Sequence, residues 1–170
     1  GDVSGFIGDL AHGKEPCHHY AYLYNYAGQS WKSQELIHRI AKEFYKAEPG
    51  GYIGNEDAGQ MSAWYIFSAM GFYPVNPAGG IYVIGTPLLP EVNISLENGK
   101  TFSMKAEKVS DKNIYIQSVK LNGQNHENVW IDHEDIMDGA TLEFVMGSKP
   151  SKWGTKSENI PLANGGVGSK

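Results

Sequence analysis

Two adjacent carboxylates, Glu56 and Asp57, lie in a glycine-bounded loop directly before an aromatic-rich segment that contains Trp64 and Tyr65. A carboxylate at such a junction can take a proton from water, which is the work of a general base. The run from Asp57 to Gln60 also has the spacing of a capping box, in which Asp57 would begin a helix. Both roles stay open for Asp57, since backbone donors that hold a carboxylate also orient it. The simplest interpretation of Glu56 is a loop position on the surface.

A second group of polar residues occupies the segment from His12 to His19, just before a run of tyrosines. Zinc binding is one interpretation of this segment, but no His-x-x-x-His pair stands at helical spacing with a further ligand. A polar loop that lines a cleft is the favoured interpretation. The glycine-rich loop 48–54 would likewise let a ligand come close to the backbone.

Three helices are expected to position these residues. The segment 18–26 is assigned to the first, although its alternation also fits a strand. Residues 33–47 repeat apolar side chains at spacings of three and four, which predicts an amphipathic helix. The third is expected over 58–70, with bulky residues on nearly all sides. Because these helices would leave an apolar face uncovered, we expect further helices from additional chain or from a partner.

Beyond Pro77 the pattern changes to short, partly alternating segments separated by turn residues such as Asn122-Gly123. Strands are expected at 81–84, 92–96, 101–105, 114–121, 129–132 and 141–145. The sequence therefore predicts an α+β fold. Its parts would be a helical segment over residues 1–77, an antiparallel β region over 78–163 and a flexible tail over 164–170.

Composition excludes several classes of function. The 170 residues carry a net charge of -5 with dispersed lysines, which argues against nucleic acid or an anionic membrane as partner. No apolar run reaches the roughly 18–20 residues of a membrane-spanning helix. The single cysteine, Cys17, gives no disulfide framework. The sequence also lacks a phosphate-binding glycine motif, a nucleophile elbow and a dinucleotide fingerprint.

Two long blocks of sequence resemble a known enzyme family. They are HGKEPCHHYAYLYNYAGQSWKSQ at 12–34 and GGYIGNEDAGQMSAWYIFSAMGFYPVNP at 50–77. Both closely resemble the C-terminal portion of the calcium-dependent inverting exo-α-mannosidases of glycoside hydrolase family ninety-two. The resemblance implies that the predicted helices are the last helices of an (α/α)6 barrel. It further implies hydrolysis of terminal α-linked mannose, often α-1,2, by single displacement with inversion.

The resemblance also implies roles for individual residues. Asp57 corresponds to the base that activates water, and Glu15 to a residue that contacts the bound mannose. Asn55 stands where some members have an aspartate, so it can orient water or sugar but cannot act as a base. Glu56 is included with Glu15 and Asn55 as a candidate substrate-binding residue, although its role is undetermined. Lys14 replaces an asparagine that is common in the family, which affects the expected linkage preference.

The family's general acid is a glutamate in a tryptophan-rich upstream stretch, and no such stretch occurs in this sequence. We therefore expect the chain to be a fragment of a larger enzyme that supplies the acid, and to be inactive alone. The expected cofactor is calcium, whose ligands are not assigned, and the expected partners are a mannose-containing glycan and the remainder of the enzyme. The resemblance implies a periplasmic or extracellular location. The alternative is a non-catalytic carbohydrate-binding or assembly module built on the β region.

Overall fold

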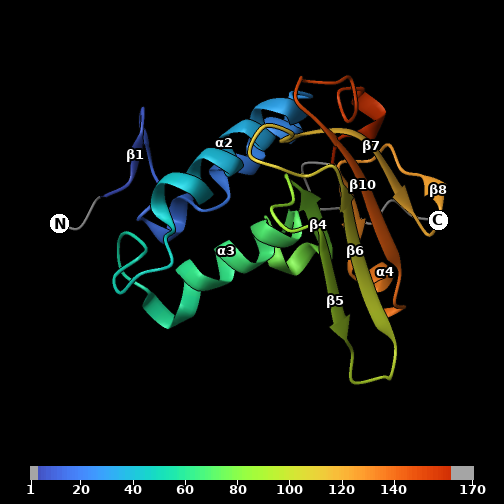
Figure 1. Ribbon diagram of the computed structural model, residues 1–170, viewed down its shortest axis with the longest axis horizontal. Coiled ribbons are helices and arrows are strands. Elements are labelled where there is room, and N and C mark those ends of the chain that lie inside the picture. Colours follow the sequence, from blue (N-terminus) through green and yellow to red (C-terminus); the bar gives the residue numbers. More distant parts are fainter. Residues whose placement is uncertain (1–3, 162–170) are drawn as a thin grey trace.

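The computed structural model describes residues 4–161, which form a helical layer and two β-sheets (Figure 1). The helical layer begins with a two-stranded hairpin and two 3-10 turns, and its two long helices are α2 and α3. Its elements are β1 (Phe6–Ile7), β2 (Leu10–Ala11), the turns Glu15–Cys17 and Tyr20–Tyr22, α1 (Leu23–Tyr26), α2 (Ser30–Phe44), the turn Asp57–Gly59 and α3 (Gln60–Met70).

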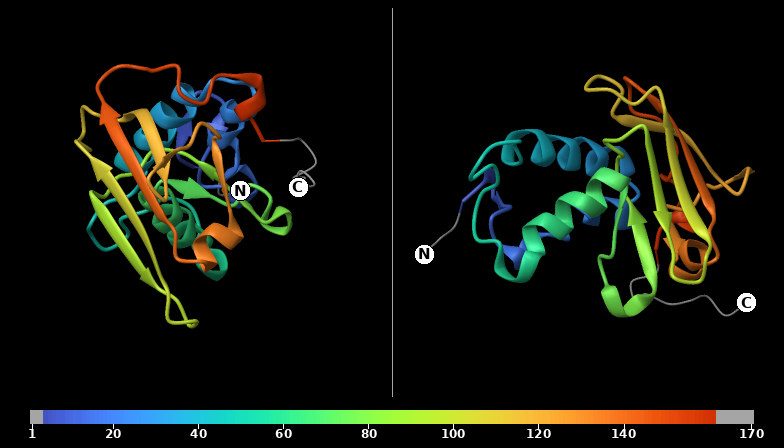
Figure 2. Two further views of the ribbon diagram at one scale, coloured as in Figure 1. Left: turned by 90° about the vertical axis from the view of Figure 1, so that its right-hand side faces the viewer. Right: turned by 60° about the horizontal axis from the view of Figure 1, so that its bottom comes forward.

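A three-stranded sheet lies between the helices and the larger sheet (Figure 2). Its strands are β3 (Phe72–Tyr73), β4 (Ile81–Ile84) and β9 (Trp130–Asp132). Because successive side chains of a strand point to opposite faces, Tyr73 and Val83 join the core with the helices, whereas Phe72 and Ile84 join the core with the larger sheet. The small sheet therefore connects the helical layer to the rest of the molecule.

The five-stranded sheet has the order β5-β6-β10-β7-β8. Its strands are β5 (Glu91–Ser95), β6 (Thr101–Glu107), β7 (Tyr115–Leu121), β8 (Gln124–Asn125) and β10 (Thr141–Gly147), and the short helix α4 (His133–Met137) precedes β10. The expectation of a purely antiparallel region is wrong at one pair, because β10 runs parallel to β6. The reason is that β10 returns between β6 and β7 and is antiparallel to β7.

The expected helices differ from the observed ones at their ends. The first is replaced by the 3-10 turn Tyr20–Tyr22 and a single helical turn, α1. The second begins at Ser30 and ends at Phe44, because Tyr45 is extended and forms a β-bridge with Tyr52. The expected helical segment 1–77 also contains the short strands β1, β2 and β3. Residues 162–163 of the expected β region and the expected tail 164–170 lie outside the described residues.

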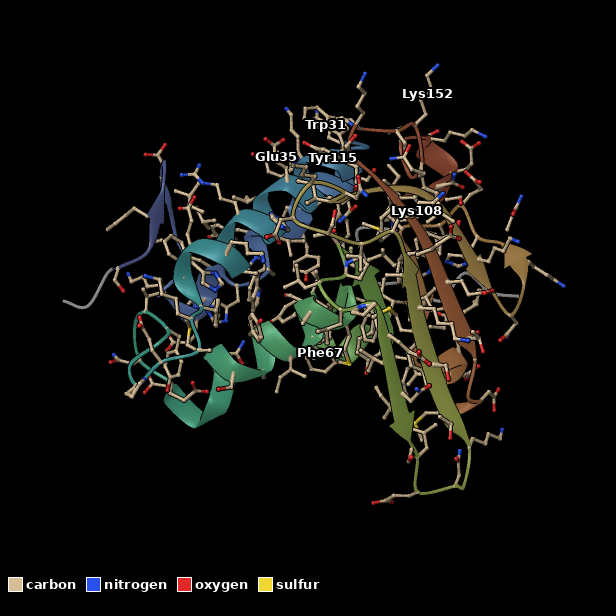
Figure 3. The ribbon with its side chains drawn as sticks, in the orientation of Figure 1. Trp31, Glu35, Phe67, Lys108, Tyr115 and Lys152 are labelled. Carbon is tan, nitrogen blue, oxygen red and sulfur yellow. The ribbon has the colours of Figure 1, made fainter. Side chains whose placement is uncertain are left out.

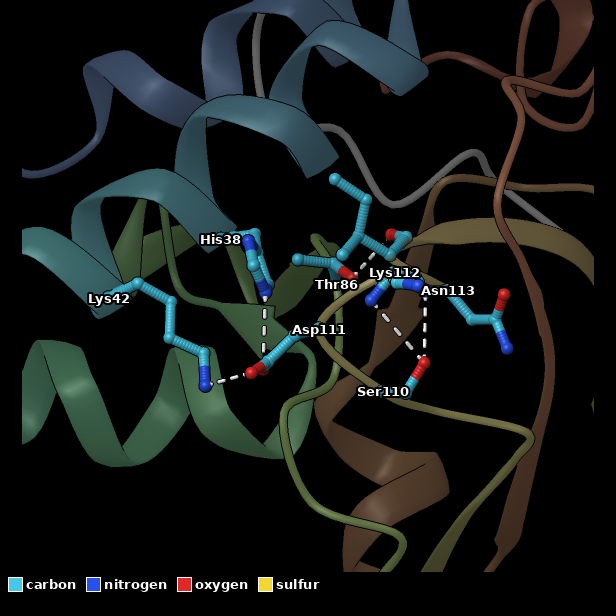
Figure 4. A network of polar contacts seen from close by, with 8 residues as sticks. His38, Lys42, Thr86, Ser110, Asp111, Lys112 and Asn113 are labelled. Atoms are coloured by element: carbon cyan, nitrogen blue, oxygen red, sulfur yellow. Dashed lines mark hydrogen bonds and ion pairs between the residues drawn. The ribbon is translucent and has the colours of Figure 1, made fainter.

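Two sets of contacts hold the helical layer against the rest of the molecule. Phe67 on α3 has its ring centroid 6.2, 6.3 and 6.0 Å from those of Phe72, Tyr73 and Tyr82 (Figure 3). On the other side, the loop after β6 reaches α2, where Asp111 Oδ1 lies 2.5 Å from Lys42 Nζ and 4.0 Å from His38 Nε2 (Figure 4). Among the described residues, no helix has the length and apolar character needed to cross a membrane.

Candidate active site

The two segments singled out in the sequence come together through their glycines. Gly54 has φ +71° and packs against Gly13, so that a Cβ on Gly54 would lie 2.6 Å from the Gly13 carbonyl oxygen. A Cβ on Gly13 would in turn lie 3.4 Å from Gly54 Cα. Such backbone contact is open only to residues without a side chain. It places the Asn55–Asp57 loop beside the turn that carries Glu15.

Glu56 holds the start of α3. Its Oε1 accepts a hydrogen bond of 3.1 Å from the Ser62 backbone N–H, and its Oε2 accepts one of 3.0 Å from the Ser62 hydroxyl. The Ser62 amide, helped by the hydroxyls of Ser62 and Tyr52, lowers the pKa of Glu56 below its ordinary value, against a smaller opposing effect of desolvation. Both oxygens of this carboxylate are therefore engaged by the protein.

The capping box expected at Asp57 is wrong. The N-cap of α3 is Gly59, without a side-chain cap, and Asp57 instead begins a 3-10 turn. The physical reason is that Ala58 and Gly59 both have positive φ, 55° and 81°, which separates Asp57 from the helix. A left-handed alanine costs roughly 1 kcal/mol. Residues with a strained backbone conformation, as at Ala58, are frequent next to functional groups.

Asp57 is the free carboxylate of the loop. Its side chain is exposed, and within residues 4–161 it forms no hydrogen bond or ion pair. Asn55, two residues earlier, is also exposed. Of the two adjacent carboxylates, Glu56 is therefore hydrogen-bonded within the protein, whereas Asp57 is available to bind water.

Glu15 carries an unpaired oxygen. The residue is half-buried at the start of the 3-10 turn Glu15–Cys17, and its Oε1 is buried with no hydrogen-bond partner among the described residues. An unsatisfied buried polar atom costs about 1–3 kcal/mol. Because Oε1 is closed off from solvent, a ligand hydroxyl could donate to it only after the Glu15 turn had moved. Lys14, its neighbour, is exposed.

We expected the segment from His12 to His19 to line a cleft. For His12 and His18 this expectation is wrong, because both side chains are buried. His12 is 1 % exposed and His18 is 2 % exposed. Their rings stack with centroids 4.8 Å apart, and Trp64 packs on His12 at 4.3 Å. Burial, reinforced by His18, lowers the pKa of His12 to about 3. Burial also lowers the pKa of His18, with its bond to the His12 carbonyl and the Glu15 charge acting in the opposite direction.

Sequence reasoning missed the polar side chains that surround these histidines. His12 Nε2 lies 2.8 Å from the Tyr45 hydroxyl, which donates to the Met61 carbonyl at 3.2 Å. Gln60 Nε2 lies 3.1 Å from His18 Nδ1. The sequence shows no sign of these pairs, because their partners are 33 and 42 residues apart and belong to different elements.

A tyrosine-lined cavity of about 350 Å³ adjoins Glu56 on the side of Ser62. Its lining includes the rings of Tyr45, Tyr52 and Tyr65. Aromatic rings of this kind would suit a sugar, although Tyr65 and the neighbouring Ile66 also form exposed apolar surface, 38 % and 57 % exposed. The cavity does not touch Asp57 or Glu15.

The described residues contain no cluster of acidic, histidine or cysteine side chains that would hold a metal ion. Calcium takes about six to eight oxygen ligands. Within residues 4–161, no group of three or more His, Cys, Asp or Glu side chains could hold a metal ion. The unpaired Glu15 oxygen is a single donor, so further ligands would have to come from elsewhere.

Comparison with known proteins identifies the family of this chain. Residues 1–148 match the model of the glycosyl hydrolase family 92 catalytic domain. The chain belongs to glycosyl hydrolase family 92. Family 92 α-mannosidases of known structure share its fold. One from Bacteroides thetaiotaomicron superposes with a TM-score of 0.90 at 43% identity, covering 94% of this chain and 22% of that one.

Two other relatives show how much of a longer protein this family 92 chain covers. An inverting mannosidase of Bacteroides thetaiotaomicron superposes with a TM-score of 0.84 at 40% identity, over 89% of this chain and 21% of that one. A protein of Arthroderma benhamiae described as an uncharacterized secreted glycosidase is 34% identical over 156 residues, which cover 90% of this chain and 20% of that protein. The chain therefore spans about a fifth of the length of its relatives.

Proposed function

We propose that the chain is the C-terminal part of an exo-acting α-mannosidase that releases terminal α-linked mannose, with α-1,2 as the first linkage to test. The observation that carries the proposal is that the two carboxylates of the 55–57 loop differ in their hydrogen bonding. Asp57 is exposed and unbonded, whereas the adjacent Glu56 has both oxygens on Ser62. A mannosidase described in complex with mannoimidazole superposes with a TM-score of 0.91, which supports a mannose-like substrate.

The proposed mechanism is a single displacement with inversion. The ionised Asp57 takes a proton from a water molecule, which attacks the anomeric carbon as the bond to the leaving oxygen breaks. A carboxylic acid on the opposite side, supplied by the rest of the enzyme, protonates that oxygen. Inverting enzymes keep the two carboxyl groups about 6.5–9.5 Å apart so that the water fits between them.

Asn55 and Glu15 are proposed to position the substrate. The exposed Asn55 amide can donate to water or to a sugar oxygen, and it carries no charge that would compete with Asp57 for the proton. The role of Glu15 comes from the family resemblance, and its buried Oε1 would accept a hydrogen bond from a sugar hydroxyl only after its turn had moved. Glu56 is kept as a candidate substrate-binding residue only through its place in the loop.

The remainder of the enzyme is the proposed partner of the helical layer. Of the nine large apolar side chains that are exposed within residues 4–161, seven belong to residues 6–66, namely Phe6, Tyr20, Leu23, Tyr24, Tyr52, Tyr65 and Ile66. A cavity of about 490 Å³ opens between Leu10, Tyr20, Tyr24 and Leu36. Further helices of an (α/α)6 barrel would cover these exposed apolar side chains, since clusters of this kind mark contact surfaces.

Calcium and location rest on the family resemblance. If calcium binds, most of its ligands come from the rest of the enzyme, and no step above is assigned to it. Treatment of the longer enzyme with EGTA should then lower activity, and added calcium should restore it. Unchanged activity would remove calcium from the proposal. A periplasmic or extracellular location is supported by the relative described as secreted.

The test of the proposed reaction is the anomer released from α-1,2-mannobiose by the longer enzyme. Proton NMR during the first turnovers should show β-mannose, which then mutarotates. Initial α-mannose would contradict inversion, and no release from any α-mannobiose would contradict the substrate class. The alternative of a carbohydrate-binding β module has less support, because the outer face of the large sheet carries the charged row Glu91, Lys105, Glu143 and Lys120 instead of exposed rings.

A further inference from the structure

The half-buried Gln60 and the buried His18 form a pair that has no part in the chemistry described above. Gln60 is the first residue of α3. The amide nitrogen, Nε2, lies 3.1 Å from His18 Nδ1 and donates to the Tyr73 hydroxyl at 3.0 Å. Because a primary amide has two N–H donors, one side chain can serve both partners at once.

The hydrogen bonds define the tautomer of His18. The other ring nitrogen, Nε2, lies 3.1 Å from the His12 carbonyl oxygen, which can only accept. The proton is therefore on Nε2, and Nδ1 is free to accept from the Gln60 amide. Burial favours the same neutral ring, since it lowers the pKa of His18. The titratable groups that act on His18 are Glu15 and His19 in its own segment and His12 across the turn.

This pair joins the ends of the two turns that carry the candidate site. The His18 N–H donates to the Glu15 carbonyl at 3.1 Å, and the Gln60 N–H donates to the Glu56 carbonyl at 3.1 Å. A further bond from α3 reaches the same place, because Trp64 Nε1 donates to the His18 carbonyl at 3.0 Å. Glu15 and Asp57 thus lie on turns whose inner ends are bonded to each other.

We propose that Gln60 and His18 are positioning residues that hold the Glu15 turn and the Asp57 turn in one relative arrangement. The inference rests on the proposed function, since it assigns the two turns to one active site. Neither side chain touches substrate. They act through Asp57 and Glu15, whose separation sets whether the water and the sugar meet in a productive geometry.

The test compares two variants of the full-length enzyme that disturb the same core. Gln60→Leu removes both amide donors at similar side-chain volume. Tyr22→Phe is the matched control, because it removes a fully buried hydrogen bond of 2.8 Å, from Tyr22 to Ser68, that touches neither turn. A misplacement of about 1 Å can cost about 100-fold in rate. We expect kcat to fall roughly 10- to 100-fold in Gln60→Leu and to stay within about twofold in Tyr22→Phe, at a similar loss of Tm.

A third variant separates positioning from general stability. In Gln60→Glu the carboxylate can only accept, so it can bond His18 when that ring is protonated. Its kcat should exceed that of Gln60→Leu and should decline as pH rises and His18 loses its proton, unlike the wild type. Equal kcat in Gln60→Glu and Gln60→Leu at every pH would overturn the proposal.

Hydrogen exchange tests the pair without reference to activity. In Gln60→Leu, peptides that span 15–19 and 57–62 should exchange at least about tenfold faster than in Tyr22→Phe. Equal exchange in both variants would contradict the joining of the turns. If the wild type cleaved no α-mannoside, the proposed function would fail, but the exchange result would still decide whether this pair holds the turns together.

Discussion

Single residues decide which of the two adjacent carboxylates is free. Ala58 and Gly59 both adopt positive φ, so the chain turns once more before α3 begins. As a result Glu56, three residues before the N-cap Gly59, reaches the Ser62 amide, and Asp57 points to solvent instead of capping the helix.

Replacing Glu56 by alanine should therefore destabilise the fold. The Ser62 amide and hydroxyl would lose their acceptor at the start of α3, which lowers the free energy of unfolding. Urea unfolding of the 170-residue chain measures the change. Glu48→Ala, which removes an exposed carboxylate from the same loop, is the matched control and should cost less than about 0.5 kcal/mol. An equal cost in the two variants would contradict the role of Glu56.

The buried His12 should make the free energy of unfolding decrease as the pH falls. Its folded pKa is about 3, below the ordinary 6.5, so between these values the unfolded chain binds a proton that the folded chain does not. The contribution is complete above pH 6.5 and decreases by about 1.4 kcal/mol per pH unit as the pH falls through this window. Urea unfolding at pH 7, 6 and 5 measures the slope. His12→Gln should have a smaller slope, and an unchanged one would show that His12 is not responsible.

At the scale of elements, an exposed ion pair joins α2 to the loop after β6, and a buried hydrogen bond joins α2 to β7. The exposed pair is Lys42 with Asp111 (Figure 4). The buried interaction is at Gln34, 2 % exposed, whose Oε1 accepts from the Ile116 N–H at 2.9 Å. Gln34 and Lys42 lie about two turns apart on the same helix, which allows a direct comparison.

We expect Gln34→Ala to cost more stability than Asp111→Asn. Loss of the buried acceptor leaves the Ile116 amide unsatisfied, at about 1–3 kcal/mol. The exposed ion pair contributes little to stability because solvent screens it. Urea unfolding of both variants, with added salt for Asp111→Asn, measures the difference. A larger cost for Asp111→Asn would reverse this ranking.

The sequence predicted elements better than it predicted their pairing. Turn residues and alternation placed the main strands within a few residues, since local chemistry determines them. The insertion of β10 between β6 and β7 could not be predicted, because it depends on contacts between distant segments. In the candidate site, residue types indicated the loop and the Glu15 turn. The sequence did not predict that Glu56, and not Asp57, contacts the start of α3. This could not be predicted because alanine rarely adopts the positive φ found at Ala58.

At the scale of the whole molecule, we propose that the described residues contribute one half of an active site. They provide a free carboxylate, an unpaired oxygen on Glu15 and an exposed apolar helical face, and they span about a fifth of the relatives' length. The isolated chain should accordingly show negligible turnover of α-mannobiose, and addition of the remaining part of the enzyme should restore it. Full activity of the isolated chain would contradict the placement of the acid outside it.

The central claim is that Asp57 activates water, and kcat of the full-length enzyme with Asp57→Asn tests it most directly. Loss of a general base lowers rate by about 100- to 10,000-fold. We expect a fall of this size with little change in KM, since asparagine keeps the shape of the side chain but cannot take the proton. Glu48→Gln, in the same loop, should keep wild-type kcat. Wild-type kcat in Asp57→Asn would contradict the account.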